Sequence, residues 1–259
     1  MDAGATAVTL DLWHTLVYLD PEDEEAYMER QIETAVAVLA AAPPRREGAE
    51  RSGDELRRVF EEEYAAAVAA SQQGRSVPPA EQIERAGARV GRAVRSSDYL
   101  DGLRRLVAQT PFRLGPGAVE AVRALRTAGH RVAVISNTVG EPGATLRPML
   151  REFGFDGPVQ TFVFSDEHPW TKPDPAIFGE ALARLGVPAA RAVHVGDGWS
   201  DIEGARRAGM RGGVLFTGLQ QYGHRYHQLF LPPGWASPET EHRIERLSEL
   251  PPLVERLLA

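Results

Sequence analysis

Charged and hydroxyl side chains stand where short apolar runs of the sequence end. Asp11 closes "TAVTLD" and Asp197 closes "RAVHVGD", with Asp201 four residues further on. Ser136 closes "RVAVIS", and Lys172 follows "QTFVFSD". Clustered carboxylates repel one another unless a cation lies among them, and their hard oxygen atoms suit Mg²⁺. A carboxylate held in this way can attack phosphorus, while a lysine and a serine hold the phosphoryl oxygens.

The elements around these residues predict how they come together. Five apolar segments have the composition of buried parallel strands, at about 6–12, 130–137, 160–166, 191–197 and 212–218. Helical patterns follow the later strands; in "DPAIFGEALARLG" we expect Asp174 to cap the helix and Gly186 to end it. Because strand and helix alternate, we predict an α/β fold with a Rossmann-like, doubly wound parallel sheet. Ligands bind at the carboxyl ends of the strands in such sheets, where the residues above are placed.

A long section with helical periodicity and no strand pattern follows the first strand. Apolar residues recur on one helix face from Met28 to Leu39, and the later part of the section predicts further helices. We therefore predict an inserted all-helical cap domain at residues 19–109. The α/β core would consist of residues 1–18 and 110–259.

Composition and charge exclude several classes of function. The net charge of −7 and the pI of about 5.6 do not favour binding to nucleic acid or to an anionic membrane. There is no cysteine, which excludes thiolate catalysis and cysteine-bound zinc. The N-terminus has no signal-peptide pattern, and the longest apolar run, residues 35–42, is too short to span a membrane. We therefore expect a cytoplasmic protein.

The motifs resemble those of the haloacid dehalogenase (HAD) superfamily of hydrolases, in the branch with a helical cap between the first two motifs. "DLWHTL" is similar to the first motif, with Asp11 as the nucleophile, and "VAVISNT" is similar to the second, with Ser136. "KPDPAIF" is similar to the third, with Lys172, and "VGDGWSDIEGARRAGM" to the fourth, with Asp197 and Asp201. All four occur in the family's order, and each falls at a predicted strand end.

The resemblance covers about residues 6–217, and the cap is its least similar part. It implies a core of five strands with the first strand in the middle. It also implies a Mg²⁺ ion bound by Asp11, Asp197 and the backbone carbonyl of Trp13. Asp201 would bind this ion through water or orient the catalytic lysine.

Trp13 departs from the family pattern. Phosphatases of this family usually carry a second aspartate there, which protonates the leaving oxygen and then activates water. An indole can do neither, and such acid–base help typically contributes about 10²–10⁴-fold. His14 or His168 could supply a proton instead, and Trp13 could form an apolar wall against the substrate.

Four functions remain open. The main hypothesis is a Mg²⁺-dependent phosphatase of a small phosphorylated metabolite, acting through an aspartyl-phosphate. The second is 2-haloacid dehalogenation, since dehalogenases of the family also lack the second aspartate; they need no metal, however, and tend to lose the acids that "GDGWSD" keeps. The third is a biosynthetic phosphoryl transfer, and the fourth is a non-catalytic protein that uses the pocket only to bind.

Other residues near the motifs are candidates for contact with the substrate or with a partner. The substrate-binding candidates are Trp13, His14, Thr15, Asn137, Tyr27 and Arg30. Tyr27 and Arg30 belong to the first cap helix, for which a solvated helix face is the alternative. The segment 220–236 is rich in aromatic residues and includes His224 and His227; it could wall the pocket or bind a second subunit, and a packed loop is favoured over a metal site. We expect a small phosphorylated substrate, no nucleic acid or membrane, and a monomer or homodimer.

Overall fold

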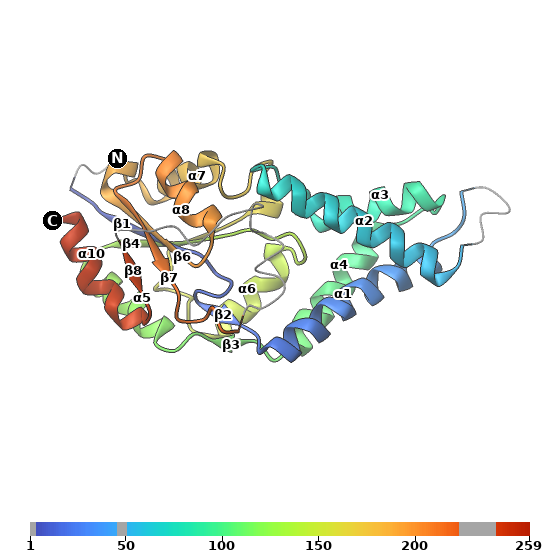
Figure 1. Cartoon of the computed structure of the whole chain (residues 1–259), viewed down its shortest axis with the longest axis horizontal. Helices are drawn as coiled ribbons and strands as arrows, with labels where there is room; N and C mark the ends of the chain where they lie inside the picture. Colours follow the sequence, from blue (N-terminus) through green and yellow to red (C-terminus); the bar gives the residue numbers. More distant parts are fainter. Residues whose placement is uncertain (1–3, 46–50, 223–241) are drawn as a thin grey trace.

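The computed structural model describes residues 4–45, 51–222 and 242–259. Figure 1 shows an elongated molecule, with a sheet and its flanking helices at one end and an arm of helices at the other. The sheet end is called the α/β part below, and the arm, residues 21–109, is called the helical insert. In the described residues, no helix combines the length and the apolar composition needed to cross a membrane.

A parallel sheet lies at the centre of the α/β part. In the described residues its six strands have the order β5-β4-β1-β6-β7-β8, and every neighbouring pair is parallel. The strands are β1 (Ala7–Leu10), β4 (Arg131–Ser136), β5 (Thr161–Phe164), β6 (Ala192–Gly196), β7 (Gly212–Phe216) and β8 (Arg243–Ile244). The predicted fold class is confirmed, and all five predicted strands form. The sixth, β8, was not predicted, because two residues are too few to show strand periodicity.

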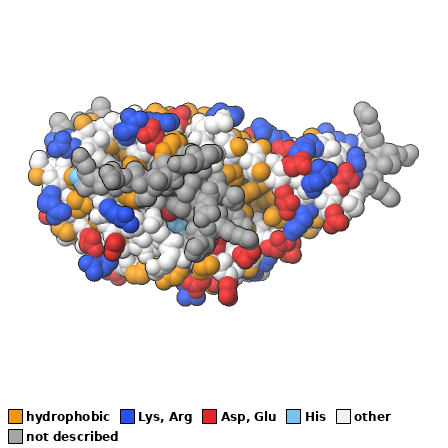
Figure 2. All heavy atoms as spheres, in the orientation of Figure 1, with side chains coloured by type: hydrophobic (Ala, Val, Ile, Leu, Met, Phe, Trp, Pro, Cys, Tyr) orange, Lys and Arg blue, Asp and Glu red, His pale blue; other side chains and the backbone are white. Residues whose placement is uncertain are grey.

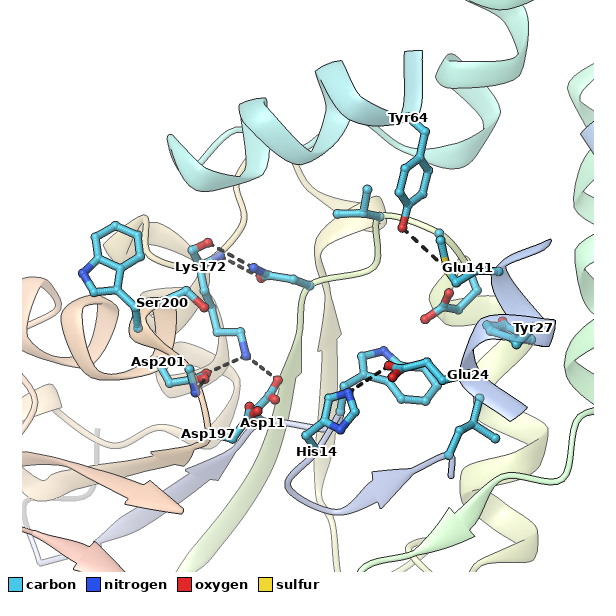
Figure 3. Close-up of a pocket in the computed structure, with 18 residues that line it drawn as sticks. Asp11, His14, Glu24, Tyr27, Tyr64, Glu141, Lys172, Asp197, Ser200 and Asp201 are labelled. Carbon is cyan, nitrogen blue, oxygen red and sulfur yellow. Dashed lines mark hydrogen bonds and ion pairs between the residues drawn. The ribbon is translucent and has the colours of Figure 1, made fainter. Parts of the chain in front are cut away.

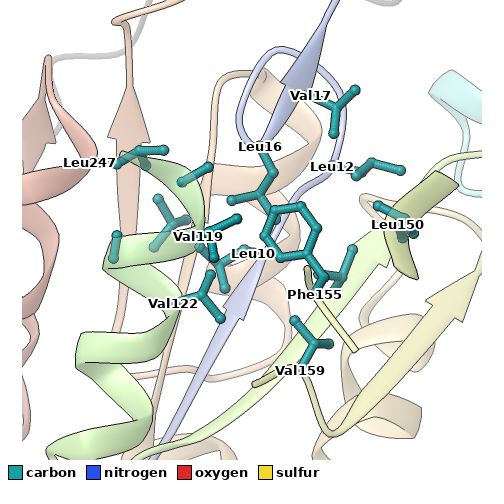
Figure 4. Close-up of a cluster of buried hydrophobic side chains, with 14 of the residues drawn as sticks. Leu10, Leu12, Leu16, Val17, Val119, Val122, Leu150, Phe155, Val159 and Leu247 are labelled. Carbon is teal, nitrogen blue, oxygen red and sulfur yellow. The ribbon is translucent and has the colours of Figure 1, made fainter. Parts of the chain in front are cut away.

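Helices cover both faces of this sheet. One face carries α5 (Ala118–Thr127), α6 (Gly143–Glu152) and α10 (Leu250–Leu258), and the other carries α7 (Pro175–Leu185) and α8 (Trp199–Arg207). On the first face Leu10 and Val122 belong to one buried cluster (Figure 4). On the second, Ile135 packs in a cluster with Phe178. Burying each such side chain contributes about 1.5–3 kcal/mol to the stability of the fold. The ends of the strands are therefore held in place by a packed hydrophobic core.

Two of the helices show what the sequence could and could not predict. The Asp174 carboxylate accepts a hydrogen bond from the Ala176 backbone N–H at 2.8 Å, and Gly186 ends α7 with φ 66°, as expected. The preceding peptide bond between Lys172 and Pro173 is cis. No helix was predicted at α6, which contains Pro148, a residue that disfavours helix interiors.

The helical insert has a hydrophobic core of its own. Its helices are α1 (Pro21–Ala41), α2 (Gly53–Gln72), α3 (Pro79–Val90) and α4 (Ser96–Gln109). Leu39, Phe60, Ile83 and Leu103, one from each helix, belong to one buried cluster. On the outer face, Arg side chains alternate with Asp and Glu side chains (Figure 2), as expected for solvated helix faces.

The chain enters and leaves the insert at neighbouring points. β2 (Val17–Tyr18) pairs in antiparallel register with β3 (Arg113–Leu114), so the two connections run side by side. A second contact lies at the far end of α2. There the Ser76 hydroxyl donates to the Ser165 carbonyl oxygen at 2.7 Å, and the Thr171 N–H donates to the Gly74 carbonyl oxygen at 3.0 Å. The division into core and cap domains stays a prediction, but the insert is held against the α/β part at both places.

Candidate active site

The three acids singled out in the sequence meet at the carboxyl ends of β1 and β6. Asp11 directly follows β1, Asp197 directly follows β6, and Asp201 lies in the first turn of α8. All three are buried, and each offers a carboxylate oxygen within 4.8 Å of the other two. The sheet order places β1 beside β6, so the convergence follows directly from the parallel topology.

Lys172 lies between two of these carboxylates. Its Nζ forms ion pairs with Asp11 and, at 2.7 Å, with Oδ1 of Asp201 (Figure 3). The lysine side chain is only 2% exposed. Its backbone is fixed by Asn137, whose Oδ1 accepts from the Lys172 N–H at 2.9 Å and whose Nδ2 donates to the Lys172 carbonyl oxygen at 3.1 Å. Asn137 therefore positions the lysine through two hydrogen bonds to its main chain.

The cluster carries more negative than positive charge. Burial raises the pKa of Asp11 to about 8, and repulsion from Asp201 and Asp197 adds to the rise, which Lys172 opposes. Although burial works against both charges, ion pairing raises the pKa of Lys172 and lowers that of Asp201. The cluster thus contains one ammonium group, that of Lys172, and three carboxyl groups. Three hard oxygen donors within reach of one another fit a small divalent cation such as Mg²⁺, which would offset the remaining repulsion.

A buried histidine supports Asp201. His194 Nε2 lies 2.9 Å from Asp201 Oδ1, and its Nδ1 lies 2.7 Å from the Thr9 hydroxyl. Burial lowers the pKa of His194, although Asp201 opposes the change, so the ring is neutral. A neutral ring that donates from Nε2 to Asp201 accepts a hydrogen bond at Nδ1 from the Thr9 hydroxyl. Gly196 completes the support, because a Cβ there would collide with the Asp201 carboxylate.

Two hydroxyl groups near the strand ends have no hydrogen-bond partner among the described residues. Ser136 Oγ and Thr15 Oγ1 are both fully buried and unsatisfied. An unpaired buried hydroxyl costs about 1–3 kcal/mol, so a hydrogen bond to a ligand oxygen would stabilise either group. Neither residue lines the pocket described next, and their roles as phosphoryl-binding and supporting residues stay predictions.

A pocket extends from the acids to the helical insert. Its described lining residues are Asp11, Trp13, His14, Leu19, Glu24, Tyr27, Met28, Tyr64, Asn137, Val139, Gly140, Glu141, Lys172, Asp197, Gly198, Trp199, Ser200 and Asp201. The acids and Lys172 form one end, and α1 with the Val139–Glu141 loop forms the other (Figure 3). Most sequence-predicted site residues therefore share one cavity.

Trp13 forms part of the pocket wall. Its ring packs against Phe112 with the ring centroids 5.4 Å apart, and Tyr27 meets the same Phe112 ring edge-on at 5.3 Å. The Trp13 indole and the Tyr27 hydroxyl also lie close enough to the Glu141 carboxyl group to lower its pKa. Trp13 thus packs on Phe112 and presents an apolar surface to the pocket beside Glu141.

The histidines proposed as proton donors have different positions. His14 adopts a left-handed backbone conformation with φ 53°, lines the pocket, and places Nε2 3.1 Å from Glu24 Oε1. His168 stacks on Trp170 with the ring centroids 5.0 Å apart and does not line the pocket. Of the two, His14 is the one placed to meet a ligand.

The remaining sequence candidates lie outside the pocket or outside the described residues. Arg30 does not line the pocket; its Nε donates to the Ala26 carbonyl oxygen along α1 at 3.3 Å. The stretch 223–241, which includes His224 and His227, lies outside the described residues. Sequence reasoning missed Glu141 and His194, although "VHVGD" gave one signal for His194, a polar residue two positions before the strand's last glycine.

The comparisons with known proteins agree with this geometry. A family model described as haloacid dehalogenase-like hydrolase matches residues 5–209. The plasmid phosphoglycolate phosphatase of Cupriavidus necator is 31% identical over 184 residues, which are 70% of this chain and 74% of that protein. The HAD phosphatase structure from Thermococcus onnurineus has a TM-score of 0.61 at 20% identity, over 96% of this chain and 97% of that one.

A solved dehalogenase structure is also similar, with a TM-score of 0.56 at 21% identity and 98% coverage of both chains. Because phosphatase and dehalogenase share the fold at this level of identity, the two structures show the architecture alone. The family model, by contrast, spans most of the chain, from β1 to the end of α8, and includes every acid of the cluster. The chain therefore belongs to the haloacid dehalogenase-like hydrolases.

Proposed function

We propose that this hydrolase is a Mg²⁺-dependent phosphatase of a small phosphorylated compound, with Asp11 as the nucleophile. The observation that carries the proposal is the buried cluster of Asp11, Asp197 and Asp201 around Lys172, in which carboxylates outnumber cations. A halide leaving group needs no such surplus of acids. A phosphoryl group held beside a divalent cation does.

In the proposed reaction, an Asp11 carboxylate oxygen attacks phosphorus and the bond to the leaving oxygen breaks, which gives an aspartyl-phosphate and an alkoxide that takes up a proton from water. Water then attacks the same phosphorus and restores the carboxylate with release of phosphate. Lys172 keeps Asp11 oriented and holds a phosphoryl oxygen, and Ser136 holds another. A bound Mg²⁺ would reduce the repulsion between the nucleophile and the phosphate dianion.

In this reaction no second aspartate of the first motif protonates the leaving oxygen or activates water. Trp13 cannot donate a proton to the leaving oxygen, so a leaving group that departs without protonation should react fastest. The helical insert would act as a cap that opens for substrate entry and closes to exclude water. We expect a cytoplasmic enzyme that is a monomer or a homodimer.

Dehalogenation of a 2-haloacid is the second candidate, and Trp13 is the observation that favours it. In that reaction Asp11 would displace halide, which needs no proton, and water would hydrolyse the resulting ester. Asp197 and Asp201 count against it. Dehalogenation needs no metal ion, so a cation site formed by three acids would have no role in that reaction.

The first test is a rate assay with p-nitrophenyl phosphate, acetyl phosphate and an unactivated alkyl phosphate, in Mg²⁺ and in EDTA. We expect Mg²⁺-dependent turnover, fastest for the two activated esters, and loss of it in Asp11→Asn. The matched control is Asp54→Asn, an exposed change at the start of α2 outside the pocket. Metal-independent release of halide from a 2-haloacid, without turnover of any phosphate, would replace the phosphatase by the dehalogenase.

A further inference from the structure

The end of the pocket far from Asp11 is acidic and apolar. Glu24 and Glu141 line it together with Leu19, Met28 and Val139. Among the described lining residues, Lys172 is the single Lys or Arg, and it is already ion-paired with two carboxylates. His14, the other basic side chain of the lining, is paired with Glu24. The described part of the pocket therefore offers no cation to an anionic group on the organic half of a substrate.

Glu141 is held in place rather than left exposed. The residue is 8% exposed, and the amide Nε2 of Gln31, itself 2% exposed, donates to Glu141 Oε2 at 3.1 Å. The Trp13 indole and the Tyr27 hydroxyl lie beside the same carboxyl group. These neighbours are all uncharged, and burial raises the pKa of Glu141 to about 7. A buried carboxyl group that is supported only by neutral donors keeps acceptor capacity for a further donor.

The position of Glu141 makes it a recognition group for the leaving half of the ester. Figure 3 shows it across the cavity from Asp11 and Lys172, beside Tyr27 of the insert. It reaches the pocket from the α/β part, in the loop between β4 and α6, whereas its partner Gln31 comes from α1. The contact between them therefore forms only when the insert lies against the α/β part.

We propose that Glu141 selects phosphate monoesters whose organic half ends in a hydrogen-bond donor, a hydroxyl or an ammonium group, and rejects those that end in a carboxylate. This proposal rests on the proposed phosphatase function and narrows its substrate class. It separates this chain from its phosphoglycolate phosphatase relative, since phosphoglycolate carries a carboxylate. Such an anion would meet Glu141 and Glu24 with no described basic group to pair with it.

The test uses phosphate monoesters that differ in one terminal group. Linear esters of two, three and four carbons, ending in ammonium, hydroxyl, methyl or carboxylate, are assayed with Mg²⁺ beside p-nitrophenyl phosphate, above about pH 8, where Glu141 is ionised. A charge-assisted hydrogen bond favours its ligand by about tenfold or more, so at the best chain length kcat/KM should fall from ammonium and hydroxyl to methyl and then to carboxylate. A carboxylate ester at the top of the order, while p-nitrophenyl phosphate is still hydrolysed, would overturn the proposal and leave the phosphatase standing.

Substitution of Glu141 assigns the preference to its carboxyl group. Glu141→Gln keeps the size of the side chain and one acceptor oxygen but removes the charge, and should lower the ratio of kcat/KM for the ammonium ester to that for the carboxylate ester by about tenfold. Glu22→Gln, on the exposed start of α1, makes the same change in net charge outside the pocket and should leave the ratio unchanged. An equal shift in both variants would overturn the role of Glu141.

A binding measurement separates recognition from chemistry. Calorimetry on Asp11→Asn, in which turnover is blocked, should show tighter binding of the ammonium ester than of the carboxylate ester. The reverse order would overturn the proposal. If no ester, p-nitrophenyl phosphate included, is hydrolysed by the wild type, the proposed function itself fails, and the substrate proposal fails with it.

Discussion

At the scale of single residues, the pocket lacks the second aspartate of the first motif. Trp13 stands at that position in the sequence, and Glu141 brings a different carboxyl group to the same cavity. The family's phosphatases usually carry an aspartate two residues after the nucleophile, and here an indole fills that space and packs on Phe112. A carboxyl group is nevertheless present in the same cavity, on Glu141, with the Trp13 indole and Gln31 beside it. The pocket thus has an acid that comes from another loop and lies across the cavity from Asp11 and Lys172.

Ionisation of Glu141 should destabilise the folded protein as the pH rises. Burial raises its pKa from 4.5 to about 7. Between these values the folded state keeps a proton that the unfolded chain has released, so stability decreases as pH rises through this window. In EDTA, urea unfolding should show that Glu141→Gln gains about 1–3 kcal/mol relative to wild type between about pH 5 and about pH 8. Equal pH dependence of the two proteins would contradict the raised pKa.

The strand-end residues of the site could be predicted from the sequence, and the residues around them could not. Asp11, Ser136 and Asp197 each end an apolar run, and parallel strands bring such ends to one edge. Glu141 depends on Gln31, which is 110 positions away in the chain and on a different part of the fold. No local pattern encodes a contact of that kind, because it forms only when the insert packs on the α/β part.

At the scale of elements, α3 of the insert is tied to the loop that carries Glu141. Gln82 Nε2 donates to the Val139 carbonyl oxygen at 2.7 Å and to the Val77 carbonyl oxygen at 2.9 Å. Gln82 is buried, and Val139 lines the pocket two residues before Glu141. The Gln82 amide therefore links the position of α3 to that of the Val139–Glu141 loop, which lines the pocket.

Removal of this amide should weaken both stability and substrate binding. Gln82→Ala leaves a buried carbonyl oxygen unpaired, which costs about 1–3 kcal/mol. The free energy of unfolding in urea should fall by that amount, and KM for the preferred ester should rise because the Val139–Glu141 loop is no longer held. Gln109→Ala, at the exposed end of α4, serves as the control and should change neither quantity.

Element boundaries were predictable where residue types alone decide them. Asp174 and Gly186 bound α7 as expected, because capping and the left-handed end are local properties. α6 escaped prediction because Pro148 interrupts its helical pattern, and β8 because it is only two residues long. In both cases the packing of the whole α/β part, and not local preference, decides the structure.

At the scale of the whole molecule, the acid cluster should couple metal binding to folding. Asp11, Asp197 and Asp201 come from two strand ends and a helix, so they form a cation site only in the folded state. A ligand that binds only the folded state stabilises it by about 2.7 kcal/mol at a concentration one hundred times its Kd. Mg²⁺ should therefore raise the midpoint of thermal unfolding in wild type, independently of any substrate.

The matched variant for this measurement is Asp197→Asn. It removes one charge and one metal ligand while keeping the size of the side chain, so the Mg²⁺-dependent rise should be much smaller. In EDTA the variant should be at least as stable as wild type, because repulsion within the cluster is reduced. A rise of the same size in both proteins would place the metal elsewhere.

The second contact between the insert and the α/β part, at Gly74–Ser76, would limit the rate of substrate association if the insert opens there. Separation there breaks three hydrogen bonds, from Ser76 to Ser165 and Pro169 and from Thr171 to Gly74. At about 0.5–1.5 kcal/mol each, these bonds leave the separated form as a minority of the molecules. If substrate enters only through that minority, its association rate is reduced by the same fraction. Substrate would then bind and dissociate slowly because of a contact that lies outside the substrate and metal sites.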